Sequence, residues 1–169
     1  MNAPTSPPLK LVPFQKTGID NLVHTTHKRF LPSIKKNGLF PSKNPYITKG
    51  IYTTPIYAYN PKLFPWKDRA KLILHLKPDA KYFENGVDYA FDALAGEGNP
   101  QFKRIYWEVL NELNLVPQEI QKPSPPRTQY EALLAKKLRE QGVDIYQSGG
   151  EIIILNPKVI TKIDLEEEE

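Results

Sequence analysis

Residues 143–163 read VDIYQSGGEIIILNPKVITKI, and this stretch decides the fold class. Val143–Tyr146 and Glu151–Leu155 are β-rich runs separated by a serine-glycine-glycine turn, so they predict two paired strands. Val159–Ile163 alternates apolar and polar residues and predicts a third strand that closes the sheet. The C-terminal part of the chain is therefore expected to supply neighbouring strands of one sheet.

The rest of the chain mixes strands and helices. Further strands are predicted at 20–26, 49–54 and 71–76. Apolar spacing and capping residues predict helices over 30–36, ended by Gly38, over 99–115, and from a capping box at 128–131 to Gly142. Because the strands and helices do not alternate strictly, the sequence predicts an α+β fold rather than a doubly wound one.

Composition limits the classes of protein that the chain can belong to. Its 169 residues, 40% of them hydrophobic, predict one globular domain. No run approaches the roughly 18 apolar residues that span a bilayer, so no membrane association is expected. The sequence contains no cysteine, which excludes disulfides, cysteine nucleophiles and thiolate metal sites.

Proline and charge mark the ends of the chain. The first residues are rich in proline, and we interpret 1–16 as a linker, 17–165 as the folded domain and 166–169 as an acidic tail. Four of the 19 acidic residues lie in that tail, which leaves 23 basic against 15 acidic residues, a net charge of +8, over the preceding chain. Such a balance suits an anionic partner, although many basic domains bind none.

Three groups of residues are candidates for a functional site. Glu151 follows two glycines and stands directly before a buried strand, where it is either a strand-end charge or a catalytic carboxylate. His24 ends a predicted strand beside two threonines and is either structural or a ligand contact. Three tyrosines follow Gly50 closely, at positions 52, 57 and 59, as core aromatics or as a stacking platform.

Other chemistries are not supported by motifs. The three histidines lack the spacing of a zinc site, and no metal is expected. Two turns are rich in glycine, SGG at 148–150 and GEG at 96–98. Neither matches a phosphate-binding loop or a dinucleotide-binding fingerprint. Kinase, P-loop and Rossmann interpretations are therefore excluded.

Taken in order, four short motifs resemble a known family. The chain contains LVHTT at 22–26, NGL at 37–39, GIY at 50–52 and GEIII at 150–154. This series is similar to the His-Tyr-Glu class of ADP-ribosyltransferases, which includes the diphtheria-type toxins and the poly-ADP-ribose polymerases. The resemblance implies a split, mostly antiparallel sheet around a cleft for NAD.

The resemblance also implies a role for each motif residue. His24 would donate a hydrogen bond to the adenosine ribose of NAD, the backbone of Thr25 would hold the nicotinamide carboxamide, and Thr26 would supply a hydroxyl on the nicotinamide side. Tyr52 would stack on the nicotinamide ring, and the second stacking residue would be Tyr57 or Tyr59. Glu151 would accept from the 2′-OH of the nicotinamide ribose and stabilise the positive charge that develops at C1′.

The implied activity is mono-ADP-ribosylation, with NAD as co-substrate and a protein or nucleic acid as acceptor. An arginine acceptor is less expected, because Gly149 occupies the position where arginine-modifying relatives carry a second glutamate. We expect a monomeric toxin or effector domain used in bacterial competition. It would reach the target-cell cytoplasm as part of a larger secreted protein, with an immunity protein as partner; the alternative location is cytoplasmic.

Two other functions remain open at this stage. An RNA 2′-phosphotransferase also starts from a His-x-Thr motif and consumes NAD, but its phosphate needs several arginines, and those of this chain lie in no recognisable motif. A basic module that binds nucleic acid or protein without catalysis would use Glu151 only as the end of a strand.

Overall fold

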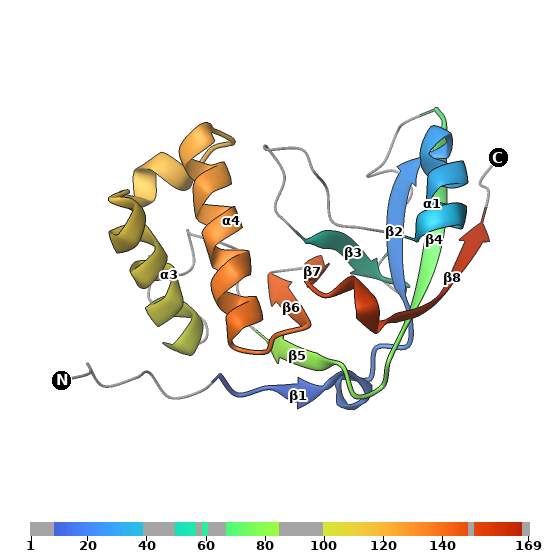
Figure 1. The fold of residues 1–169 in the computed structure, drawn as a ribbon, viewed down its shortest axis with the longest axis horizontal. Coiled ribbons are helices and arrows are strands. Elements are labelled where there is room, and N and C mark those ends of the chain that lie inside the picture. Colours follow the sequence, from blue (N-terminus) through green and yellow to red (C-terminus); the bar gives the residue numbers. More distant parts are fainter. Residues whose placement is uncertain are drawn as a thin grey trace.

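The computed structural model describes residues 9–38, 50–56, 59–60, 67–84, 100–148 and 151–166. Within them, the strands form one eight-stranded sheet of order β1-β5-β6-β7-β3-β2-β4-β8 (Figure 1). The strands are β1 (Val12–Pro13), β2 (Leu22–His27), β3 (Ile51–Pro55), β4 (Arg69–Leu76), β5 (Lys81–Glu84), β6 (Ile145–Ser148), β7 (Glu151–Ile154) and β8 (Ile160–Glu166). Of the described pairs, only β5–β6 is parallel. The protein therefore has an α+β fold with a mostly antiparallel sheet, as predicted.

Three α-helices flank this sheet in the described part of the chain. They are α1 (Leu31–Asn37), α3 (Pro100–Leu113) and α4 (Pro125–Glu140). Single turns of 3-10 helix lie at η1 (Phe14–Thr17), η2 (Lys28–Phe30), η5 (Pro117–Ile120) and η6 (Pro157–Val159). In Figure 1, α3 and α4 pack side by side at one end of the molecule, whereas α1 lies beside β4 and β8 at the other end.

Strand alternation divides the core between the two faces of the sheet. On β7, Ile153 points into the cluster formed with α3 and α4, whereas its neighbours Ile152 and Ile154 point into the second cluster. The second cluster continues across the sheet to Leu72 and to Leu31 of α1. The continuous apolar run of β7 thus reflects burial of both faces of a central strand.

The boundary predicted for the N-terminal linker is wrong. Val12 and Pro13 pair with β5, and the Phe14 side chain is only 3% exposed, in the core beside Tyr82. The main-chain nitrogen of Phe14 also donates to the carbonyl of Ala80 at 2.8 Å. Residues within the expected 1–16 linker therefore belong to the folded domain. Burial of the large Phe14 ring stabilises the docked segment even though its composition is rich in proline.

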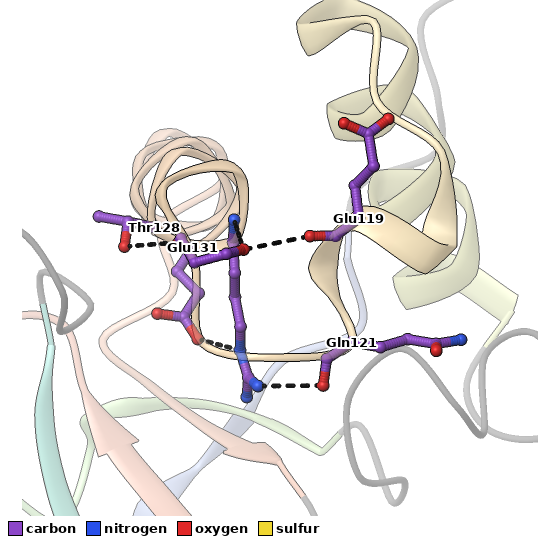
Figure 2. Close-up of polar contacts among 6 residues, drawn as sticks. Glu119, Gln121, Thr128 and Glu131 are labelled. Carbon is purple, nitrogen blue, oxygen red and sulfur yellow. Dashed lines mark hydrogen bonds and ion pairs between the residues drawn. The ribbon is translucent and has the colours of Figure 1, made fainter.

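The start of α4 also differs from the expected capping box. The helix begins at Pro125, and the N-cap is Ser124, whose hydroxyl accepts from the main-chain nitrogen of Arg127 at 3.3 Å. Glu131 does not serve as a cap. It is buried and accepts from Nε of Arg127 at 3.2 Å, as Figure 2 shows. Two prolines in the first turn favour this earlier start, since they lack the N–H groups that a helix leaves unpaired there.

Candidate active site

The ladder between β2 and β3 is short, and its end marks the centre of the candidate site. The two strands pair only at Leu22–Pro55 and Val23–Thr54, whereas β2 pairs with β4 along all six of its residues. Directly beyond the last pair, Nδ1 of His24 lies 2.7 Å from the main-chain oxygen of Tyr52. A histidine side chain thus continues the contact between the two strands where the ladder stops.

This hydrogen bond determines the tautomer of the His24 ring. Burial lowers the pKa of His24, and the hydrogen bond to Tyr52 opposes that shift only in part, so the ring is neutral at pH 7. A carbonyl oxygen can only accept, so Nδ1 carries the proton and Nε2 carries the lone pair. In this tautomer Nε2 of His24 can accept a hydrogen bond but cannot donate one, which is the reverse of the direction that the resemblance implied.

Glu151 and Tyr52 lie on neighbouring strands and on the same face. Tyr52 pairs with Ile153 in the antiparallel ladder between β3 and β7, and Glu151 precedes Ile153 by two residues. Diagonal neighbours of this kind have Cβ atoms about 7–8 Å apart. Glu151 is exposed as the first residue of β7, so its carboxylate is accessible beside the half-buried Tyr52 ring.

Beneath these two residues lies a buried tyrosine that the sequence analysis did not single out. Tyr146 is 2% exposed and pairs with Ile153 from the opposite side of β7. Burial raises the pKa of the Tyr146 hydroxyl, and the nearby Tyr52, Glu131 and Glu151 raise it further. Glu131 of α4 and Glu151 of β7 thus both act electrostatically on the Tyr146 hydroxyl.

The position of Glu131 on α4 is the sequence feature that indicates its burial. Counting from Arg127, residues 127, 131, 134 and 138 follow helical spacing, and Leu134 and Leu138 are core positions. A glutamate in such a stripe is directed toward the sheet. The sequence analysis gave this glutamate to a helix cap instead, and so missed it.

The two threonines after His24 point to opposite faces. Strand alternation places Thr25 on the face of Tyr52, because Val23 pairs with Thr54 of β3. Thr25 Oγ1 is buried and has no hydrogen-bond partner among the described residues. Thr26 points to the other face, together with His24.

Tyr59 lies near the candidate site because its ring contacts Lys71. Lys71 is the cross-strand partner of Thr25, and its Nζ lies 4.7 Å from the centre of the Tyr59 ring. The same ammonium lies 3.1 Å from Oε2 of Glu166. Glu166 is the last residue of β8 and pairs with Lys71, so it belongs to the sheet and not to the predicted acidic tail. A cation and an aromatic ring therefore stand beside the buried Thr25 hydroxyl.

The structure thus brings most of the predicted residues to three adjacent central strands. His24 contacts the main chain of Tyr52, and Tyr52 and Glu151 are diagonal neighbours. Thr25 shares the face of Tyr52 and Glu151, whereas the His24 and Thr26 side chains point to the other face. Tyr57, the other predicted stacking residue, lies outside the described residues, as do both glycines that precede Glu151.

Packing against β7 explains why the first residue of the GIY motif, Gly50, is a glycine. A Cβ atom on Gly50 would collide with the Cγ2 methyl of Ile153 and would lie 3.3 Å from the main-chain oxygen of Ile154. The absent side chain lets the start of β3 lie tight against the end of β7, beside Ile153 and Ile154.

Searches for other features and for relatives gave no match. Across the described ranges, no group of three histidine, aspartate or glutamate side chains could hold a metal ion, and no helix there has the length and apolarity to cross a bilayer. No protein-family model matches the chain, and comparisons with curated proteins and with solved structures find no significant similarity.

Proposed function

We propose that this protein is a mono-ADP-ribosyltransferase that cleaves NAD and transfers ADP-ribose to a macromolecule. The observation that carries the proposal is the arrangement at the end of the β2–β3 ladder, where His24 bonds to Tyr52 and Glu151 follows on the next strand. The three residue types of the His-Tyr-Glu class thus lie on three adjacent strands, with the Tyr52 and Glu151 side chains on one face of the sheet and the His24 ring on the other, bonded to the Tyr52 main chain.

The chain's own groups suit the binding of NAD. The lone pair on Nε2 of His24 accepts from a ribose hydroxyl. The flat ring of Tyr52 offers a stacking surface whose two torsions are restrained by packing against the core. Thr25 Oγ1 supplies a buried hydroxyl on the same face as Tyr52. The Tyr52 ring and the Thr25 hydroxyl share a face and suit an aromatic ring with its polar substituent, and a ribose would reach His24 past the end of the β2–β3 ladder.

Glu151 supplies the electrostatic part of the reaction. When the bond from C1′ to nicotinamide breaks, nicotinamide leaves with the electron pair and positive charge develops on the ribose. An ionised carboxylate beside C1′ stabilises that charge, and a nucleophile of the acceptor then forms a bond to C1′ and loses its proton. The exposure of Glu151 leaves room for a large acceptor to approach.

Release of nicotinamide from NAD, measured by chromatography with the purified protein, tests the proposal. Glu151→Gln keeps the size of the side chain but removes its charge, so the rate should fall by about 10²–10³-fold with the melting temperature unchanged. Glu140→Gln, at an exposed position at the end of α4, is the matched control and should retain the wild-type rate.

Two outcomes would contradict the proposal. Equal rates for Glu151→Gln and the wild type would remove Glu151 from the reaction. No release by the wild type, with bacterial lysate present as a source of acceptor, would favour the basic binding module in which Glu151 only begins a strand.

A further inference from the structure

A groove between α1 and β8 lies apart from the candidate active site. It has a volume of about 660 Å³ and is formed by one side of α1, the outer strand β8 and the turn η6 between β7 and β8. Figure 1 shows α1 and β8 together at the end of the molecule opposite α3 and α4. Volumes of this size are typical of binding pockets in proteins.

The floor of the groove is aliphatic. Leu31 and Ile34 come from α1, and Ile160, Ile163 and Leu165 come from β8. All of these except Leu31 are only partly buried, so the floor presents apolar surface that a bound group could cover. Among the residues that the structure describes, no aromatic side chain lines the groove.

The rim of the groove is basic. Lys35, Lys158 and Lys162 line it with exposed side chains, and no aspartate or glutamate in the described part of the chain does so. Lys162 lies 3.4 Å from Oδ1 of Asp164. The ammonium groups of Lys35 and Lys158 pair with no carboxylate among the described residues. The rim is thus complementary to a partner with negative charge.

We propose that this groove docks an acidic amphipathic helix of a partner protein. Aliphatic side chains of the helix would fill the floor, and flanking carboxylates would pair with the three lysines. Nucleic acid fits less well, because bases stack on aromatic rings and none of the described residues of this floor is aromatic. An added β-strand would pair with the edge of β8, whereas the groove lies on the face of the sheet beside α1. The inference does not depend on NAD cleavage.

The test uses a synthetic helical peptide with leucine at every third or fourth position and glutamate at most others. Titrated into the full-length ¹⁵N-labelled protein, it should shift the amide signals of Leu31–Gly38 and Ile160–Leu165. The double change Lys158→Glu and Lys162→Glu should weaken binding by at least about tenfold. The same peptide with serine in place of leucine should not bind.

A matched control separates the groove from general charge attraction. Lys122→Glu with Lys136→Glu changes the net charge equally, at exposed positions beside and on α4, and should leave the affinity within about twofold. Equal weakening by both pairs would overturn the proposal, as would failure of the peptide to bind.

Two further outcomes would identify a different occupant and so overturn the proposal. One is tighter binding of a single-stranded oligonucleotide that shifts the same amide signals. The other is peptide binding that begins only after residues 167–169 are removed, which would assign the groove to the chain's own acidic tail.

Discussion

The imidazole of His24 replaces a main-chain group as the partner of Tyr52, with its Nδ1 atom 2.7 Å from the Tyr52 carbonyl oxygen. This contact links two residues of the candidate site directly and fixes the tautomer of the ring. Because the same contact joins β2 and β3, protonation of His24 should affect the pairing of these two strands. A proton added to the ring must reside in a buried setting that lowers its pKa.

Stability should therefore depend on pH through His24. Below the ordinary histidine pKa of 6.5 the unfolded chain takes up a proton that the folded chain resists. The free energy of unfolding should then fall as the pH is lowered from 7 toward 5. Urea unfolding across pH 5–8 measures this slope, and His24→Gln should flatten it.

The chosen range lies above the titration of Asp164. The pKa of Asp164 is lowered from 3.8 by its hydrogen bond to His75, so its protonation falls below this range. An identical slope in the wild type and in His24→Gln would show that the lowered pKa does not contribute to folding.

The ring of Tyr52, rather than its hydroxyl, should matter for NAD. Tyr52→Phe keeps the stacking surface and should retain most activity. Tyr52→Leu keeps an apolar side chain against the core but removes the ring, so KM for NAD should rise about three- to tenfold, in line with ~0.5–1.5 kcal/mol for a stacking pair. Steady-state kinetics of nicotinamide release checks both, and equal losses in the two variants would point to the hydroxyl.

A side chain at position 50 should disrupt the strands of the site. Gly50→Ala places a methyl group against the Ile153 side chain in a packed interior, and overpacking of this kind costs about 1–3 kcal/mol. Urea unfolding of Gly50→Ala, alone and together with Ile153→Ala, measures the coupling. The cost of Gly50→Ala should shrink when Ile153 is shortened, and purely additive effects would exclude the contact.

The strands that carry the site were predictable because each is an apolar or β-branched run. Ile51–Pro55, Arg69–Leu76 and Glu151–Ile154 all coincide closely with the predicted strands. β1 and β5 were missed, since two and four residues give too short a pattern, and their pairing depends on contacts between distant parts of the chain.

The site was only partly predictable, for a related reason. The residue types and their strands follow from the sequence, but the contact between His24 and Tyr52 depends on where a ladder between distant segments ends. A sequence pattern links residues that are close along the chain, so Glu131 was interpreted as part of a helix cap. In the fold, Glu131 is instead buried and pairs with Arg127.

Phe14 should be essential for folding even though it lies in a proline-rich segment. Its side chain packs in the core against Tyr82, so Phe14→Ala should lower the free energy of unfolding by about 3–5 kcal/mol. Gln15→Ala changes an exposed neighbour and should stay within about 0.5 kcal/mol. Chemical unfolding of both variants makes the comparison, and near-normal stability of Phe14→Ala would restore the interpretation of this segment as a linker.

The buried pair of Arg127 and Glu131 should stabilise the fold only while both partners are present. Glu131 is 7% exposed, and its carboxylate accepts from Nε of Arg127, whose Nη1 lies 3.5 Å from the main-chain oxygen of Gln121 (Figure 2). Arg127→Leu removes the positive charge that pairs with the buried Glu131 carboxylate and should cost about 3 kcal/mol. Adding Glu131→Leu removes that charge, so the double variant should recover most of the loss. A double-mutant cycle by urea unfolding measures the difference, and a double variant less stable than Arg127→Leu would show that the carboxylate stabilises the core without its partner.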